Sequence, residues 1–435
     1  MLIIYSPIIT ARLQYTCSFI FKELMGQEFK LTTDEERFSK ADGVKINYSD
    51  LTHFTQAITI QPQGLLQQAG IIIQPIECFN YNGNKAFFKT SSGDFPFDIF
   101  AAVFYLLSRY EEYLPHTKDM YGRYAHENSL AFKEGFLQLP LINIWIQDFM
   151  QFLQAHSFSS SIHPSHFTIQ NKPFSFLATY DIDIAYSYKH KGFLRNAGGF
   201  FKQPSLQRLK VLLGLQQDPY DSYEWLHQLH AAHPNVLPIY FFLVPDKNGL
   251  YDKNILPRHP AMKALIKNHA AKYTIGLHPS WQSGDAENLL KEEKELLEAI
   301  AGQPITASRQ HFLRFNLPQG YQRLIDAGVT ADYSMGYGSV NGFRASVASS
   351  FYWYNLQTDD STHLRIHPFC FMEANSFYEQ HFTPQQALEE MKYYYAICKN
   401  VQGEFISIWH NHFVGTDKLF EGWKEVYEEF MTVCK

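Results

Sequence analysis

The sequence predicts an α/β protein in which helices flank a parallel sheet, with a smaller α/β domain before it. Three observations support this prediction. Beyond about residue 171, apolar segments of strand length alternate with amphipathic segments of helix length, which is typical of parallel βα units. Seven or so such units in roughly 260 residues favour a barrel over an open sheet. A chain of 435 residues, 46% of them hydrophobic, also exceeds what one ordinary core needs.

Residues 1–160 are predicted to form the smaller domain. The segments LIIY (2–5) and GIIIQPIE (70–77) have the apolar character of strands, whereas FDIFAAVFYLLSRYEEYL (97–114) carries the apolar stripe of a helix. The polar, turn-rich segment HSFSSSIHPSHF (156–167) is predicted to link the two domains. The residues of the smaller domain indicate no chemistry. It could cover the mouth of a barrel and restrict access.

Residues 171–435 are predicted to form the barrel-like domain. Its expected strands are FSFLATYDID (174–183), VLPIYFFLV (236–244), YTIGLH (273–278), ASRQHFLRF (307–315), ADYSMGY (331–337), THLRIHPF (362–369) and EFISIWHNH (404–412). Its expected helices are SYEWLHQLHAAHP (222–234), HPAMKALIKNHAAK (259–272), ENLLKEEKELLEAIAG (287–302), PQGYQRLIDAG (318–328) and PQQALEEMKYYYAICKN (384–400).

Composition narrows the classes of partner and compartment. The formal charge of −6, the pI near 6.3 and the lack of a recognisable basic run or basic helix argue against a nucleic-acid partner. The odd number and wide spacing of the cysteines exclude a disulfide framework and a cysteine zinc site, and favour a reducing compartment. The cysteines are Cys17, Cys78, Cys370, Cys398 and Cys434. With no signal-peptide pattern and no apolar run of about 20 residues, the expected location is the cytoplasm, without a transmembrane segment.

Chemistry-bearing side chains gather where the predicted strands end. Asp181 and Asp183 follow LATY, His278 follows YTIGL, the SRQHFLR segment supplies two arginines, and His410 with His412 follows ISIW. Residues two apart on a strand point to the same face, so Asp181 and Asp183 would repel unless a cation, a proton or an arginine lies between them. The carboxyl ends of parallel strands form the working edge of such folds, so these endings are expected to converge.

The predicted donor set suits a metal-dependent reaction. Carboxylates and imidazoles without a thiolate fit zinc best, with cobalt, manganese or iron as alternatives. A catalytic site of this kind keeps one coordination position open for a water that becomes acidic enough to attack at neutral pH. A second carboxylate would accept the proton of that water, and a histidine opposite would protonate the leaving group.

Five motifs in this order resemble those of the polysaccharide deacetylase superfamily, the metal-dependent esterases of carbohydrate esterase family four. They are TYDID, IGLHPSWQ, SRQHFLR, DYSMGY and ISIWHNH, and the resemblance covers residues of about 171 to 435. It implies an irregular (β/α)7 barrel and hydrolysis of an N-acetyl or O-acetyl group of a sugar. The smaller domain resembles a segment of unknown role that precedes such domains in some bacterial proteins.

The resemblance also implies a role for individual residues. It makes Asp181 the general base and Asp183 a metal ligand, so that one carboxylate holds the metal while the other acts on its water. It makes His278 the first metal histidine and His410 the general acid. The remaining residues that it assigns are Arg309 or Arg314, one of which would orient the base, and Asp332, which would support the catalytic histidine.

The sequence departs from the family pattern at the second metal histidine. The family has a histidine four residues after the first, where this chain has Gln282. Glutamine is a poor zinc ligand, so the third ligand stays open between Gln282, His311 and His412. A site that binds metal weakly or not at all would instead belong to a binding protein descended from an enzyme.

Three functions follow from these residues. The leading hypothesis is a metal-dependent hydrolase that removes an acetyl group from an acetylated sugar. The alternatives are a metal-dependent amidohydrolase acting on a non-sugar amide and a non-catalytic carbohydrate-binding protein with a degenerate metal site. The lack of an export signal favours a small or lipid-linked intracellular substrate.

Overall fold

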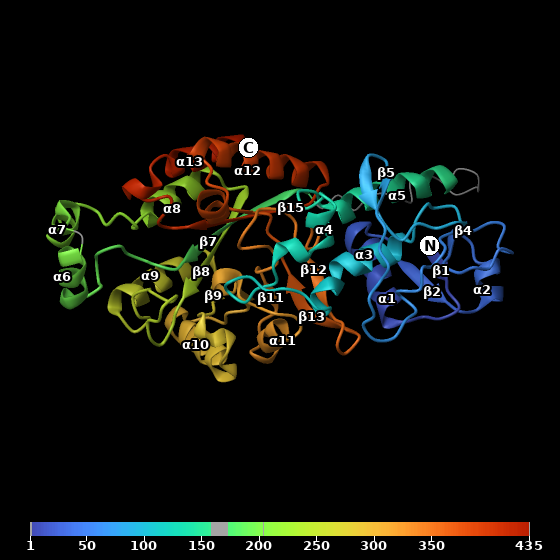
Figure 1. Ribbon diagram of the computed structural model, residues 1–435, viewed down its shortest axis with the longest axis horizontal. Coiled ribbons are helices and arrows are strands. Elements are labelled where there is room, and N and C mark those ends of the chain that lie inside the picture. Colours follow the sequence, from blue (N-terminus) through green and yellow to red (C-terminus); the bar gives the residue numbers. More distant parts are fainter. Residues whose placement is uncertain (1, 158–172, 203, 435) are drawn as a thin grey trace.

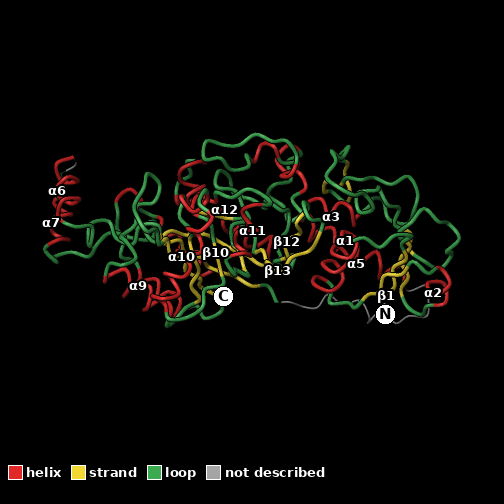
Figure 2. Tube along the Cα trace, turned by 90° about the horizontal axis from the view of Figure 1, so that it is seen from below, coloured by secondary structure: helices red, strands yellow, loops and turns green. Residues whose placement is uncertain are grey.

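The computed structural model describes residues 2–157, 173–202 and 204–434 (Figure 1). Of the predicted linker 156–167, only its first two residues are described, and they end a helix; the rest lies outside the described residues. Figures 1 and 2 show an elongated molecule, with residues 2–157, here named the N-terminal region, at one end and helices α6 and α7 at the other. In the described part of the chain, no helix has the length and apolar character needed to cross a bilayer.

The N-terminal region contains a four-stranded parallel sheet in the order β2-β1-β3-β4 and a short hairpin. The strands are β1 Leu2–Tyr5, β2 Phe29–Thr32, β3 Val44–Asn47 and β4 Ile58–Thr59, with β5 Phe79–Tyr81 and β6 Asn84–Ala86 in the hairpin. The helices are α1 Ala11–Cys17, α2 Glu35–Lys40, α3 Ile99–Leu107, α4 Leu130–Lys133 and α5 Leu141–Ser157. The predicted strand at the N-terminus is confirmed as β1, which is buried throughout.

The predicted strand GIIIQPIE is wrong, because residues 71–77 form no regular structure. Ile72 and Ile73 are exposed, and the hydroxyl of Tyr110 satisfies the backbone of Ile72 in place of a neighbouring strand. The predicted helix 97–114 is shorter than expected. It consists of α3 and a separate 3-10 turn at Tyr110–Tyr113, divided by Arg109 in the left-handed region.

The rest of the chain forms one large sheet, with nine strands among the described residues, in the order β12-β13-β11-β10-β9-β8-β7-β15-β14. All neighbours are parallel except β12 and β13. The strands are β7 Ser175–Ile182, β8 Val236–Leu243, β9 Thr274–His278, β10 Ala307–Ser308, β11 Ala331–Asp332, β12 Phe351–Asn355, β13 Asp360–Ile366, β14 Phe371–Met372 and β15 Glu404–His410. The predicted closed (β/α)7 barrel is not shown, because β12 and β14 stand at open ends of this order.

Helices cover the large sheet from two sides (Figure 1). The helices are α6 Phe193–Lys202, α7 Leu206–Leu212, α8 Tyr223–Ala232, α9 Pro260–Ala270, α10 Glu287–Ala301, α11 Gln319–Asp326, α12 Pro384–Asn400 and α13 Trp423–Val433. Helices α8, α12 and α13 lie on one side, and α9, α10 and α11 lie on the other. The predicted helix that ends at Gly302 is confirmed as α10, since this glycine caps it with a φ of 75°.

Several parts of the second region differ from the prediction. The segment ADYSMGY is a strand only at Ala331–Asp332, and β12 was not predicted. Two further departures concern connections between strands. The segment SRQHFLR is a strand only at Ala307–Ser308, after which the chain turns through a 3-10 segment at His311–Leu313. Residues 184–221 were not assigned from the sequence, and they contain α6 and α7. Both departures lie at the carboxyl end of the sheet, where the chain leaves regular strand geometry.

A buried ion cluster joins the N-terminal region to the second region. The guanidinium of Arg344 donates two hydrogen bonds to Glu112, at 2.8 and 2.6 Å, and Arg109 donates a third at 2.8 Å. All three side chains are almost completely buried. Burial raises the pKa of Glu112, but Arg344 and Arg109 outweigh it and lower the pKa to about 2. Arg344 is therefore a buried residue that joins the two regions, and not a surface arginine.

We expect Glu112→Gln to lower the free energy of unfolding by about 3 kcal/mol, because it removes the charge that compensates two buried arginines. The pKa of Glu112 is lower in the folded protein than its ordinary value of 4.5. Its contribution is therefore present above pH 4.5 and is lost as the pH falls toward about 2. Urea unfolding across this pH range measures both effects.

The matched control is Glu36→Gln, since Glu36 forms an exposed ion pair with Lys40. Such a pair contributes at most about 1 kcal/mol, so this variant should unfold almost as the parent does. Equal effects of the two substitutions would show that the buried cluster contributes no special stability.

Candidate active site

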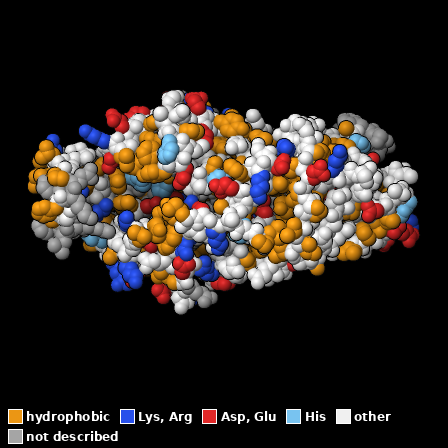
Figure 3. All heavy atoms as spheres, in the orientation of Figure 1, with side chains coloured by type: hydrophobic (Ala, Val, Ile, Leu, Met, Phe, Trp, Pro, Cys, Tyr) orange, Lys and Arg blue, Asp and Glu red, His pale blue; other side chains and the backbone are white. Residues whose placement is uncertain are grey.

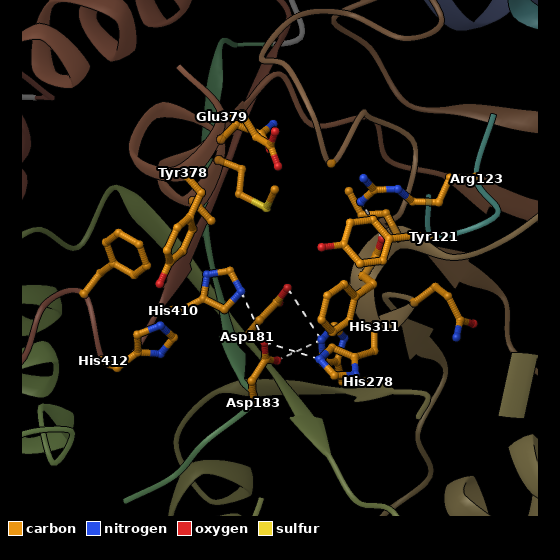
Figure 4. A pocket seen from close by; sticks show the side chains of 18 residues that line it. Tyr121, Arg123, Asp181, Asp183, His278, His311, Tyr378, Glu379, His410 and His412 are labelled. Carbon is orange, nitrogen blue, oxygen red and sulfur yellow. Dashed lines mark hydrogen bonds and ion pairs between the residues drawn. The ribbon is translucent and has the colours of Figure 1, made fainter. Parts of the chain in front are cut away.

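The sheet brings the predicted catalytic strand endings together. In the register of β7 and β15, Asp181 lies directly beside His410, and β9 ends with His278 two strands away from β7. Asp183 follows β7, and His311 follows β10. Figure 4 shows these five side chains pointing into one cavity. The predicted convergence of strand ends therefore occurs in the structure.

Three side chains form a cluster that could hold a metal ion. Potential ligand atoms of Asp183, His278 and His311 all lie within 4.8 Å of one another. Nε2 of His278 is 3.0 Å from Oδ1 of Asp183, and Nε2 of His311 is 3.5 Å from Oδ2. Oδ1 of Asp183 is buried, and no donor among the described residues meets it in hydrogen-bond geometry. One carboxylate and two imidazoles match the donor set of a zinc site with an open position.

Both imidazoles of this cluster are oriented through their other nitrogen. Nδ1 of His278 donates to the carbonyl of Arg309, and Nδ1 of His311 donates to Asp252 at 2.9 Å. The Nε2 atoms are thereby left to face Asp183. A carboxylate or carbonyl behind a ligand histidine is the usual support of a metal site, because it fixes the tautomer and the ring.

The charges of the cluster are strongly coupled. Burial raises the pKa of Asp183, but the imidazoles of His311, His410 and His278 lower it well below its ordinary value. Burial lowers the pKa of His311, yet Asp183 and Asp252 outweigh it and raise this pKa to about 9. Without a metal, a proton on imidazole therefore compensates the carboxylate. A divalent cation could replace that proton.

Gln282, the doubtful ligand, takes a different position. Its amide donates to Oδ2 of Asp252 at 3.2 Å and to the carbonyl of Lys247 at 3.4 Å. It therefore supports the carboxylate that orients His311. Of the three alternatives for the third ligand, His311 joins the cluster, and His412 lines the cavity with its ring 5.4 Å from that of His410. Burial lowers the pKa of His412 to about 3, so its imidazole is neutral.

The two candidate arginines are clearly separated. Arg309 is buried, and its Nη1 donates to Asp181 at 2.9 Å and to the hydroxyl of Thr179 at 2.7 Å. Arg314 instead donates to the carbonyl of Trp281 and to Asp285, with its guanidinium over the Trp281 ring. Arg309 is therefore the arginine that contacts the predicted base.

The carboxylate behind His410 is Glu373 rather than the predicted Asp332. Oε1 of Glu373 accepts hydrogen bonds from Nδ1 of His410 at 2.6 Å and from its backbone N–H at 2.7 Å. Burial lowers the pKa of His410, but Glu373 and Asp183 raise it well above its ordinary value. Asp332 accepts from the backbone and hydroxyl of Ser334, and burial raises its pKa to about 6.

Glu373 was missed because no motif contains it. It directly follows β14, which pairs with the catalytic strand β15. The signal available in the sequence was a carboxylate at the end of the apolar segment PFCFME (368–373), the same pattern that marks Asp181 and His278. A carboxylate therefore lies behind His410 as predicted, but it belongs to Glu373 and not to Asp332.

The cluster opens into a cavity of about 400 Å³. Tyr121 and Arg123 line it, although both belong to the N-terminal region. Across from them in Figure 4 lie Tyr378 and Glu379. A second cavity of about 390 Å³ shares Asp183, His311, Phe312 and His412 with the first and extends toward Leu250, Tyr251 and Lys253. Asp183 and His311 of the cluster therefore line both cavities.

Arg123 holds the turn that carries His311. Phe312 and Leu313 have φ values of 55° and 53°, a left-handed conformation that costs a residue with a side chain about 1 kcal/mol or more. Nη1 of Arg123 donates to the carbonyl of Phe312 at 2.9 Å, while Asp119 fixes the same guanidinium at 2.6 Å. A Cβ at Gly338 would lie 2.0 Å from Nη1 of Arg123, so this glycine leaves room for the arginine.

Comparisons with known proteins give one match for the N-terminal region and remote matches for the rest. Residues 2–158 match the model of a family of unknown function (DUF7033). The comparison with curated proteins gives no match. The residues of the candidate site lie outside the matched segment, apart from the cavity-lining pair Tyr121 and Arg123.

Three solved structures illustrate the remote similarity. A protein assigned as a polysaccharide deacetylase from Mycobacterium smegmatis is 17% identical, with 61% of this chain and 85% of that chain covered and a TM-score of 0.40. One assigned as a polysaccharide deacetylase from Pseudomonas aeruginosa is 10% identical, with 60% and 83% covered and a TM-score of 0.38. A family-four pseudoenzyme from Bacillus anthracis is 9% identical, with 63% and 67% covered and a TM-score of 0.32. At these values, the functional argument depends on the geometry of this chain.

We expect Arg123→Ala to speed hydrogen–deuterium exchange of the amides of residues 311–314 by roughly tenfold, since a hydrogen bond from a charged donor contributes about 1.5–3 kcal/mol. Lys118→Ala is the matched control, because Lys118 lies in the same loop with an exposed side chain. Mass spectrometry of the peptides covering this turn measures the effect. Unchanged exchange in Arg123→Ala would show that other contacts hold the turn.

Proposed function

We propose that this protein is a metal-dependent hydrolase that removes an acetyl group from an N-acetylated or O-acetylated carbohydrate. The observation that carries the proposal is the cluster of Asp183, His278 and His311. Two further side chains flank this cluster in the same cavity: Asp181, which accepts a hydrogen bond from an arginine, and His410, which donates one to a glutamate. This arrangement supplies a base and an acid on either side of a candidate metal site. Arg309 orients Asp181, and Glu373 orients His410.

Zinc fits the donor set best, with cobalt, manganese or iron as alternatives. Asp183, His278 and His311 would hold the ion, which when bound would make a water acidic enough to attack and would polarise the acyl carbonyl. The supports of this site belong to the chain itself. Asp252 and the carbonyl of Arg309 keep both histidine rings turned toward Asp183.

Asp181 is placed to accept a proton. Arg309 neutralises one of its oxygens, Oδ1, and its other oxygen, Oδ2, lies 3.9 Å from Nε2 of the ligand His278. This contact with Arg309 orients the carboxylate, which is almost completely buried. Asp181 is therefore the general base for an attacking water in this proposal.

His410 is placed to donate a proton. Glu373 holds Nδ1, so Nε2 faces the cavity, 3.4 Å from Oδ2 of Asp183. The carboxylate behind the ring favours the imidazolium, which can protonate a leaving amine or alcohol. Since Asp181 and His410 are neighbours across β7 and β15, the proton can be accepted and donated on one edge of the sheet.

The cavity suits a sugar ring better than a small amide. Tyr121 and Tyr378 offer aromatic surface, while Asn375 and Glu379 offer polar groups. Aromatic rings bind the apolar faces of sugars, and polar side chains bind their hydroxyls. The carboxylate, metal and histidine set itself does not specify what carries the acyl group, so a non-sugar amide stays an alternative for the test below.

We also infer that the large sheet is an irregular seven-membered barrel. The chain runs from β13 directly to β14, and the intervening backbone reaches both neighbours: Phe369 N–H donates to Met335, and Cys370 N–H donates to Ile406. This one extended segment could bridge β11 and β15 and so close the ring.

The five cysteines, all unpaired, agree with the predicted reducing compartment, the cytoplasm.

We expect protein purified without chelators to contain close to one transition metal per chain, and Asp183→Ala, His278→Ala and His311→Ala each to lose it. Gln282→Ala is the matched control and should retain the metal with weaker affinity, because Gln282 acts only through Asp252, and outer partners typically change metal affinity by about 10- to 100-fold. Elemental analysis and competition with a chelating dye measure both. Metal retained in His311→Ala but lost in Gln282→Ala would overturn the assignment of the third ligand.

We expect Asp181→Asn and His410→Ala to lower kcat by about 10²- to 10⁴-fold while the metal content stays unchanged, because each removes one proton transfer. Acetate release from acetylated sugars, tested beside small acetylated amides, measures activity and separates the two enzyme hypotheses. Glu373→Gln should lower kcat less than His410→Ala does. Full activity in both catalytic variants, or sugar binding without turnover that survives chelation, would favour the non-catalytic alternative.

A further inference from the structure

The described residues of the segment 184–217, which are 184–202 and 204–217, form a helical projection that the proposed reaction does not use. The segment is here named the α6–α7 arm. The arm connects β7 to α8 and contains α6 and α7. Figures 1 and 2 both place these two helices at the end of the molecule opposite β1 and α2, beyond the helices that cover the large sheet. A connection of this length is not needed to join a strand to the next helix of a parallel sheet.

The base of the arm is firmly anchored. Asp218 is buried, and its carboxylate accepts the backbone N–H groups of Ser187, Tyr188 and Lys189 at 2.7, 2.8 and 2.9 Å. The amide of Asn411 donates to the carbonyl of Ile184 at 3.1 Å and to that of Tyr220 at 2.9 Å, so it holds both ends of the arm. The projection is therefore built on a fixed base.

Large apolar side chains of the arm face solvent. The side chains of Phe201, Leu206, Leu213 and Leu215 have relative exposures of 86, 77, 73 and 74%. Leu209 and Leu212 are also exposed. Figure 3 shows hydrophobic side chains gathered over this end of the molecule. Single exposed leucines are ordinary, but a group of this size on one short segment marks an interaction surface.

The charge of the arm is opposite to that of the whole chain. Residues 184–217 contain six of the 37 lysines and arginines and none of the 43 aspartates and glutamates, whereas the formal charge of the chain is −6. The six cations are spread along the segment, which explains why no basic run was recognised in the sequence. Lys210 is exposed beside the leucines of α7, and Arg208 stacks on Tyr188.

We propose that the α6–α7 arm docks this protein on an anionic membrane surface. Exposed leucine and phenylalanine side chains on short helices, combined with lysine and arginine and no carboxylate, are the features of segments that lie in a bilayer interface. The apolar side chains would enter the region between headgroups and acyl chains, while the cations would contact anionic headgroups. A carboxylate-free surface of this kind fits a negatively charged layer better than another copy of this acidic chain.

The position of the arm connects docking to the candidate active site. The arm begins one residue after Asp183, and Asn411, which holds its base, lies between His410 and His412. The base of the arm is therefore continuous with the strand endings that carry the candidate site, whereas α6 and α7 lie at the end of the molecule. The docking itself does not require the proposed reaction, so the two can be tested separately.

The test is flotation of the full chain with vesicles of phosphatidylcholine, with and without phosphatidylglycerol. The wild type should float with the anionic vesicles and much less with the neutral ones. Leu213→Ser with Leu215→Ser should lower the partition coefficient by about tenfold or more, and Lys210→Glu by about fivefold. Ile73→Ser and Lys30→Glu, exposed substitutions in the N-terminal region, should bind as the wild type does. Asp183→Ala should also bind fully, because it alters only the metal cluster.

Two results would overturn the proposal. One is a failure of the flotation pattern: the wild type does not float with anionic vesicles, or the control variants lose as much binding as the arm variants do. The other is a dimer, detected by light scattering after size-exclusion chromatography, that the leucine substitutions convert to a monomer while vesicle binding is absent. That outcome would assign the exposed surface to self-association. Because the side chains of Leu213, Leu215, Lys210, Ile73 and Lys30 are all exposed, thermal unfolding should be unchanged in the variants at these positions.

Discussion

The site depends on two carboxylates, Asp181 and Asp183, that end the central strand β7. Carboxylates this close repel unless each has its own positive partner. Arg309 supplies that partner to Asp181, and the imidazoles of His278 and His311 supply it to Asp183. The partners come from two other places in the sheet, the end of β9 and the segment after β10, so neutralising the two charges also fixes how these two places meet β7. The pair therefore determines both the chemistry of the site and its assembly.

The third candidate ligand, His311, belongs to a hydrogen-bonded chain that includes Gln282. His311 comes from a turn rather than from the segment after His278, and its ring needs a support that the turn itself does not provide. Asp252 gives this support, and Gln282 donates to the same carboxylate. The glutamine thus orients the ligand indirectly. His311, Asp252 and Gln282 therefore form one hydrogen-bonded chain, in which the glutamine lies behind the candidate ligand.

The sequence predicted those features that neighbouring residues determine, namely most strands, most helices and the polar strand endings. Most strands and helices after residue 171 lie where periodicity placed them, and the strand endings at Asp181, His278 and His410 converge as expected. The errors arise where the register of the sheet or a distant segment decides. Glu373 supports His410 because β14 pairs with β15, and no spacing along the chain reveals that pairing. Arg309 and Arg314 are close in sequence, and only the turn at 311–313 directs one inward and the other outward.

The N-terminal region takes part in the site rather than only covering it. Its core is continuous with that of the large sheet, and Glu112 compensates the buried guanidinium of Arg344. Arg123 bonds to the turn that carries His311, where two successive left-handed residues need external support. Without this region, Arg344 would be a buried charge without its carboxylate, and the turn would lose its hydrogen bond from Arg123. A lid that only restricts access would leave the geometry of the candidate ligands unchanged when removed. These contacts instead make the position of His311, the third candidate ligand, depend on both regions.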